Sequence, residues 1–219
     1  MSDSIINLIR REKLIAICRG IEASKCLKVA EALYAGGFKL LEITFDQKHP
    51  DSWQVTADAI AAVAREYAGR MEVGAGTVTS VELAELAHSA GAKFIISPDS
   101  NPAVIRRTKE LGMVSLPGAL TPSEAMIAHN AGADFVKLFP ISDLGVGYVK
   151  AVRAPLSHID FMAVGGVNTD NLKSFLDAGC VGAGIGGCLV NKKWVEAGEF
   201  DKITQVAEEM VKIIQEYNK

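Results

Sequence analysis

A single lysine stands inside a largely apolar run, Asp134-Phe135-Val136-Lys137-Leu138-Phe139-Pro140. Such a run is typical of a strand that is buried on both faces of a parallel sheet. Burial disfavours the ammonium form and lowers the pKa of an amine, which a lysine needs if it is to attack a carbonyl carbon at neutral pH. The alternative is that Lys137 ends an edge strand and extends its amine into water. The run therefore makes Lys137 a candidate nucleophile.

A glutamate occupies a similar place in a second apolar run, Leu40-Leu41-Glu42-Ile43-Thr44. Because side chains alternate along a strand, Glu42 shares one face with Leu40 and Thr44. If that face and the face of Lys137 both line the inside of one sheet, the two side chains lie near each other. They would then form a nucleophilic amine beside a general acid/base. A buried structural Glu–Lys ion pair is the alternative interpretation.

Two glycine pairs, Gly165-Gly166 and Gly186-Gly187, each follow an apolar run. Glycine lets the backbone approach a ligand closely, so the pairs favour an anion site built from N–H groups, although each could also be a tight turn. Arg19 and Thr77 also follow apolar runs and supply a cation and a hydroxyl suited to a carboxylate. Taken alone, Arg19 could be an ordinary surface charge.

The composition excludes several other functions. The 219 residues are 49% hydrophobic and 22% charged with a net charge of -3, which argues against binding to nucleic acid or to an anionic membrane. No run has membrane-spanning length, and the N-terminus lacks a signal-peptide core. The cysteines and histidines lack metal-ligand spacing, so we expect reduced thiols and no metal: Cys18, Cys26, Cys180, Cys188, His49, His88, His129 and His158. We expect a cytoplasmic protein with one domain, residues 1–219.

The apolar runs alternate with helical patterns eight times after an amphipathic lead-in helix over residues 1–11. The expected strands are 14–18, 38–44, 71–75, 94–96, 113–116, the run around Lys137, 160–164 and 181–185. Ser24 is expected to cap the helix that ends near Tyr34, and the last helix is expected over 200–217. Eight βα units in this length predict an α/β fold, a (β/α)8 TIM barrel. An open doubly wound sheet is the alternative, but its Gly-rich fingerprint does not follow the first strand.

In such a barrel the functional residues lie at the carboxyl ends of the strands. The unusual residues of this sequence gather there, whereas the amino ends carry ordinary turn residues. They are Arg19, Glu42, Thr44, Gly74 to Thr77, Ser97-Pro98, Pro117-Gly118, Lys137, Gly165-Gly166 and Gly186-Gly187.

Six motifs follow one another in order along nearly the whole chain. They are Leu41-Glu42-Ile43-Thr44, Gly74-Ala75-Gly76-Thr77-Val78, Phe94-x-x-Ser97-Pro98, Pro117-Gly118-x-x-Thr121-Pro122, Val136-Lys137-Leu138-Phe139-Pro140 and Gly165-Gly166-Val167-Asn168. This set resembles the 2-keto-3-deoxy-6-phosphogluconate / 4-hydroxy-2-oxoglutarate (KDPG/KHG) aldolases. The resemblance implies a class I aldolase that cleaves a 2-keto-4-hydroxy acid to pyruvate and an aldehyde. It also implies that the enzyme needs no metal or other cofactor and forms a homotrimer.

The same resemblance implies roles for individual residues. Lys137 would form the Schiff base, and Glu42 would transfer protons. The remaining residues would hold the pyruvate carboxylate (Arg19, Thr77 and the Gly76 backbone), line the pocket (Pro98 and Phe139) or face a distal phosphate (Gly165, Gly166, Gly186 and Gly187).

Three positions depart from the family pattern. Asp46 stands where many members have an arginine, and Val164 and Gly187 replace a threonine and a serine beside the phosphate. The substrate could therefore lack a phosphate or differ in length. Two other functions stay open from the residues: a phosphate-binding isomerase or epimerase with Glu42 as base, and a non-catalytic keto-acid sensor.

Overall fold

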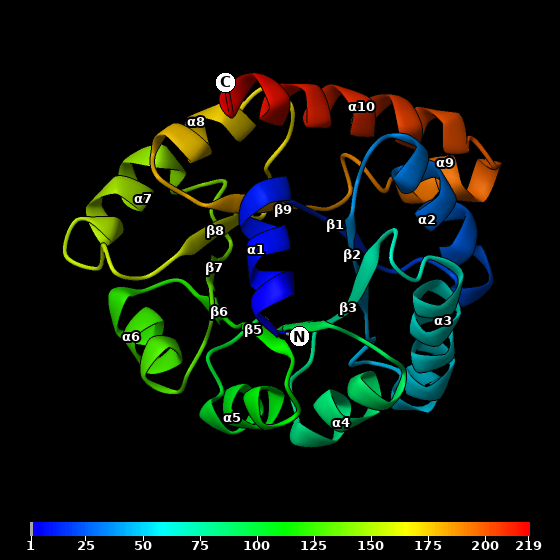
Figure 1. Ribbon diagram of the computed structural model, residues 1–219, viewed down its shortest axis with the longest axis horizontal. Coiled ribbons are helices and arrows are strands. Elements are labelled where there is room, and N and C mark those ends of the chain that lie inside the picture. Colours follow the sequence, from blue (N-terminus) through cyan, green and yellow to red (C-terminus); the bar gives the residue numbers. More distant parts are fainter. Residues whose placement is uncertain (1) are drawn as a thin grey trace.

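A computed structural model describes residues 2–219, in which nine parallel strands form one sheet (Figure 1). The order around the sheet is β5-β4-β3-β2-β1-β9-β8-β7-β6. The strands are β1 Leu14–Cys18, β2 Leu40–Thr44, β3 Glu72–Gly76, β4 Phe94–Ile96, β5 Val114–Leu116, β6 Gly118–Ala119, β7 Val136–Leu138, β8 Phe161–Val164 and β9 Gly182–Ile185. Each pairs in parallel with the next strand in this order, as expected for repeated βα units.

The sheet closes into a barrel at its fifth strand, which Pro117 divides into β5 and β6. β5 pairs with β4, and β6 pairs with β7. Backbone hydrogen bonds also join β5 and Pro117 to the segment of β7. The N–H of Phe135 donates to the carbonyl of Ser115 (3.2 Å), and the N–H of Lys137 donates to the carbonyl of Pro117 (2.9 Å). The predicted (β/α)8 barrel is therefore confirmed, and the open doubly wound sheet is excluded.

Helices surround the strands in Figure 1. They are α1 Ser2–Glu12, α2 Cys26–Ala35, α3 Trp53–Glu66, α4 Val81–Ser89, α5 Pro102–Glu110, α6 Pro122–Asn130, α7 Gly145–Arg153, α8 Leu172–Asp177, α9 Lys192–Ala197 and α10 Phe200–Tyr217, with short 3-10 turns at Ala23–Lys25 and Pro50–Ser52. The lead-in helix α1 lies over the middle of the barrel in this view. Its Ile5 and Ile9 are buried in the same cluster as Ile15, Phe94 and Phe135, so α1 covers one end of the inner core.

Several element boundaries differ from the sequence-based expectations. Most strands begin one or two residues later than expected; β2, for example, begins at Leu40 rather than at residue 38, because the ladder to β3 begins there. Ser24 is not a helix cap, since its hydroxyl donates to Glu22 within a 3-10 turn and α2 begins only at Cys26. Thr121, in contrast, caps α6 in a capping box with Glu124.

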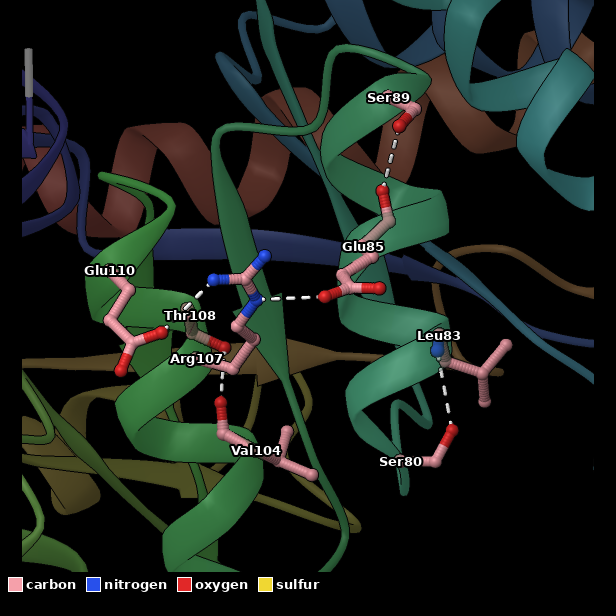
Figure 2. A network of polar contacts seen from close by, with 8 residues as sticks. All are labelled: Ser80, Leu83, Glu85, Ser89, Val104, Arg107, Thr108 and Glu110. Carbon is pink, nitrogen blue, oxygen red and sulfur yellow. Dashed lines mark hydrogen bonds and ion pairs between the residues drawn. The ribbon is translucent and has the colours of Figure 1, made fainter.

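Polar contacts join α4 to α5 on the outside of the barrel (Figure 2). The guanidinium of Arg107 lies between Glu85 of α4, at 2.9 Å, and Glu110 of its own helix, at 3.0 Å. Ser80 caps α4 by accepting a hydrogen bond from the N–H of Leu83. These contacts fix the helix that follows the Thr77 loop.

The cysteines are all free thiols, and three of them, Cys18, Cys26 and Cys180, are buried. Cys188 differs, because it is exposed and its Sγ lies 3.2 Å from the carbonyl of Val167. In the described part of the chain, no helix combines the length and the apolar character needed to cross a bilayer.

Candidate active site

Glu42 and Lys137 lie on opposite walls of the barrel. Their strands, β2 and β7, are four places apart in the sheet order, with β1, β9 and β8 between them. Lys137 pairs on both sides, with Gly118 of β6 and Met162 of β8, so it does not belong to an edge strand. Both side chains therefore reach the lumen from a fixed backbone, as inner positions of a barrel do.

Both charged side chains are buried without forming an ion pair. Glu42 is 0% exposed and Lys137 is 4% exposed. Neither oxygen of Glu42 has a hydrogen-bond partner within residues 2–219, and no carboxylate in that range lies within 4.0 Å of Lys137 Nζ. The amine instead lies 4.4 Å from the centre of the Phe139 ring. Buried groups of this kind normally have partners, so their unsatisfied atoms indicate a place for a polar ligand.

The pKa values of the two groups shift in opposite directions. Burial lowers the pKa of Lys137; the carboxylate of Glu42 opposes this change, and the charge of Arg19 adds to it. Burial also raises the pKa of Glu42, while the charges of Lys137 and Arg19 lower it. The site therefore favours a neutral amine and a protonated carboxyl more than water does, which suits a nucleophile beside a group that exchanges protons.

Two glycines of β3 make room for the inner side chains. A Cβ on Gly76 would lie 1.7 Å from Oε1 of Glu42, and a Cβ on Gly74 would lie 2.2 Å from the ring of Phe94. Neither position can carry a side chain without displacing its neighbour. Gly76 thus allows the Glu42 carboxylate to occupy its place in the lumen.

A cavity of about 310 Å³ extends from Lys137 to the ends of β8 and β9. It is lined by Ile17, Arg19, Lys137, Phe139, Val164, Gly165, Gly166, Val167, Asn168, Gly184, Gly186, Gly187 and Cys188. Gly165 and Gly166 both have left-handed φ values, 97° and 72°, which glycine adopts readily. Asn171 fixes this turn by donating a hydrogen bond from Nδ2 to the Gly166 carbonyl, at 2.9 Å.

A second cavity of about 740 Å³ adjoins the first, because Arg19 lines both. Thr44 and Thr77 line this larger cavity. Thr44 Oγ1 lies 3.4 Å from the carbonyl of Cys18, whereas the buried Oγ1 of Thr77 has no partner in residues 2–219. A hydroxyl without a partner and an exposed arginine in the lining of one cavity are suited to an anionic group of a ligand.

The residues predicted from the sequence lie in four places. Arg19, Lys137, Phe139 and both glycine pairs line the smaller cavity; Arg19, Thr44 and Thr77 line the larger one. Glu42 and Gly76 are buried behind these surfaces, and Pro98 is exposed at the end of β4 and lines neither cavity.

The sequence reasoning missed several cavity residues. Strand parity could have identified Ile17, which pairs with Glu42 across β1 and β2. Asn168 was present in the Gly165-Gly166 motif but was assigned no role. Cys188 gave no such signal, because its place depends on the path of the loop after β9.

Comparison with known proteins agrees with this geometry. The family model described as "KDPG and KHG aldolase" matches residues 5–206. The chain belongs to this family. The resemblance noted from the sequence motifs is thereby confirmed, and the chain is an aldolase, which is a lyase.

Relatives within the family differ in the substrate that their names specify. The 2-dehydro-3-deoxy-6-phosphogalactonate aldolase of Escherichia coli strain K12 is 39% identical over 80% of this chain and 83% of its own length. The 2-dehydro-3-deoxy-phosphogluconate aldolase of Treponema pallidum is 31% identical over 96% of this chain and 98% of its own. Similarity in sequence thus extends across relatives with different named substrates.

Two solved structures, a native KDPGal structure and a KDPG aldolase, share the fold. A native KDPGal structure has a TM-score of 0.82 at 36% identity and covers 93% of this chain and 94% of its own. The KDPG aldolase of Legionella pneumophila, with pyruvate captured as a covalent carbinolamine, has a TM-score of 0.83 at 25% identity. The match covers 93% of this chain and 96% of the Legionella chain. A covalent adduct of pyruvate in this neighbour is consistent with class I aldolase chemistry in the family.

Proposed function

We propose that this aldolase works through a Schiff base on Lys137 and cleaves a 2-keto-4-hydroxy acid to pyruvate and an aldehyde. The observation that carries the proposal is the buried amine of Lys137, which has a lowered pKa, no ion-pair partner in residues 2–219, and a direct opening to a cavity. A neutral amine in that position can attack a ketone without a metal ion.

The reaction begins when Lys137 Nζ attacks the C2 ketone to give a carbinolamine, and loss of water leaves an iminium. Glu42, directly or through a water molecule, removes the proton from the C4 hydroxyl. The C3–C4 bond then breaks, the aldehyde leaves, and the electron pair of that bond flows to the iminium nitrogen to give an enamine. Protonation of C3 and hydrolysis release pyruvate and the free amine. The iminium is the electron sink.

The other residues bind the two ends of the substrate. Arg19, Thr77 and the Gly76 backbone hold the pyruvate carboxylate, an assignment supported by the unpartnered Thr77 hydroxyl. Phe139, which lines the smaller cavity beside Lys137, flanks the reacting carbons, whereas Pro98 lines neither cavity and has no role in this proposal. The distal end extends along the smaller cavity to the Gly165-Gly166 and Gly186-Gly187 turns, which line it and where the lack of a side chain lets an anion approach the backbone. Val164 and Gly187 contribute no hydroxyl there, so binding of the anion relies on the backbone.

Among the possible substrates we propose 2-dehydro-3-deoxy-6-phosphogalactonate. Two relatives with this substrate in their names are 39% and 37% identical to the chain, whereas a KHG/KDPG aldolase of Escherichia coli is 34% identical. The gluconate compound, which differs at C4, and the unphosphorylated 4-hydroxy-2-oxoglutarate are the competing candidates.

The test is a comparison of kcat/KM for these three compounds, with pyruvate release as the readout. We expect the galactonate compound to have the highest value. Because C4 carries the hydroxyl that loses its proton, a wrong configuration there displaces that group from Glu42 and lowers kcat. A higher value for either competitor would overturn the substrate assignment and leave the aldolase chemistry in place.

We also propose that the chain forms a homotrimer in the cytoplasm. The trimer rests on the family resemblance, and a designed protein cage built by fusing symmetric oligomeric domains has a TM-score of 0.83 to this chain. The cytoplasmic location is supported by the four free thiols. Light scattering coupled to size-exclusion chromatography tests the trimer directly.

A further inference from the structure

Gln47 connects two loops beside the larger cavity. It lies three residues beyond β2, and its Nε2 donates a hydrogen bond to the Thr77 carbonyl at 2.8 Å. Its Oε1 accepts one from the hydroxyl of Thr79 at 2.9 Å. Both ends of the amide therefore bind the loop after β3, the loop that carries Thr77.

Thr77 needs such support because of its backbone conformation. Its φ is +57°, in the left-handed region, which residues with a Cβ adopt rarely and only when their surroundings enforce it. The residues on either side are held by the sheet: Phe45 N–H donates to the Gly76 carbonyl, and Val78 N–H donates to the Ile96 carbonyl. The Thr77 carbonyl between them is held by the Gln47 side chain.

The loop that carries Gln47 is itself anchored. The indole N–H of Trp53 donates to the Asp46 carbonyl at 2.9 Å, and the carboxylate of Asp46 accepts from the Lys48 N–H at 2.8 Å. Gln47 thus extends from a fixed turn. An amide placed in this way can select one peptide orientation in a neighbouring loop.

We propose that Gln47 is a positioning residue for substrate binding, because its amide holds Thr77 in the conformation that presents the unpartnered hydroxyl to the substrate carboxylate. This inference rests on the function proposed above. Gln47 acts through Thr77, and its contribution is to place a donor before the ligand arrives.

A comparison of Gln47→Leu with Gln54→Leu tests this role. Gln54 is exposed on α3, and its amide donates to Asp58 and has no other side-chain partner within residues 2–219. The same substitution there removes a surface amide that lines neither cavity. For each protein, the pyruvate concentration that gives half-maximal borohydride-trapped adduct is measured, together with kcat for cleavage and the melting temperature.

We expect Gln47→Leu to raise the half-saturating pyruvate concentration about fivefold, the effect of losing about one neutral hydrogen bond, with a change in kcat below about twofold. Gln54→Leu should match the wild type. Thr79→Val removes only the support at Oε1 and should cause a smaller rise, which Thr79→Ser should reverse because serine keeps a hydroxyl.

The outcomes separate the two proposals. An unchanged half-saturating concentration in Gln47→Leu, with or without a lower melting temperature, would show a structural role only and overturn the inference. If Gln47→Leu does not fold, an unchanged concentration in Thr79→Val would likewise overturn it. Absence of an adduct in the wild type would instead overturn the Schiff-base function on which the inference rests.

Discussion

The two buried charges of the site influence each other although they form no ion pair. The Glu42 carboxylate raises the pKa of Lys137 and so opposes the effect of burial. Each group therefore influences the protonation state of the other, although burial has the larger effect on both. Substitution of one of them should be visible in the pH dependence of the other.

Replacement of Glu42 by glutamine should move the titration of Lys137 to lower pH. The neutral amide no longer attracts the ammonium group, so the pKa of Lys137 falls further and the neutral amine forms at lower pH. The rate of borohydride trapping with pyruvate rises with pH as the amine loses its proton. In Glu42→Gln this rate should reach half its maximum at a lower pH than in the wild type. Cleavage should slow by about 10² to 10⁴, the usual contribution of a general base.

The exposed Glu82 provides the matched control, since Glu82→Gln should leave both the pH midpoint and the cleavage rate unchanged. A midpoint for Glu42→Gln that stays in place or moves to higher pH would contradict the electrostatic coupling between Glu42 and Lys137.

The carboxylate of Glu42 should be equally sensitive to the space beside it. In Gly76→Ala the new methyl group would lie 1.7 Å from Oε1, so the carboxylate must move away from the reacting carbons. We expect cleavage to fall by about 10²-fold, as small displacements of catalytic groups often do. Gly147→Ala on α7 meets no atom within 4 Å and should retain full activity. Equal rates for the two variants would show that the position of Glu42 does not matter.

At the scale of elements, helix α4 depends on its N-terminal cap. Ser80 Oγ accepts from the N–H of Leu83, and its loss in Ser80→Ala should lower the free energy of unfolding by about 1 kcal/mol. Ser89 lies near the other end of α4, where its hydroxyl donates to the Glu85 carbonyl (Figure 2). Ser89→Ala should change the stability by less than about 0.5 kcal/mol. Urea denaturation measures both values, and equal losses would argue against the cap.

The elements also show how far the sequence could predict the structure. Strand parity predicted which residues share a face with Glu42 and with Lys137, because a side-chain period of two is a local property of the chain, but not that these faces are the inner ones. The split of the fifth strand at Pro117 was missed because it depends on pairing with two different strands, β4 and β7. The short helix α9 was missed although Asn191 caps its start and Gly198 its end.

For the site, the sequence predicted candidate residues but not how they lie relative to one another. Residue types at strand ends indicated the candidates, but not that Glu42 and Lys137 stand on opposite walls without pairing. The contact between Gln47 and Thr77 also had no sequence signal, because it joins the loops that follow two different strands.

At the scale of the whole molecule, α1 covers the inner core of the barrel. Ile9 is 0% exposed and packs in one cluster with Phe94, Phe135 and other lumen residues, whereas Ile6 of the same helix is only partly buried. Ile9→Ala should therefore lower the free energy of unfolding by about 2 to 5 kcal/mol, and Ile6→Ala by clearly less. Denaturant titration gives both values. A similar loss from each would show that α1 does not insert Ile9 into the core.

The central claim is that Lys137, at the carboxyl ends of the barrel strands, is the nucleophile. Its most direct test is reduction of the protein with borohydride in the presence of pyruvate, followed by peptide mass spectrometry. We predict a reduced pyruvate adduct on Lys137, and no adduct in Lys137→Met. An unmodified wild-type protein, or an adduct on a different lysine, would contradict the assignment.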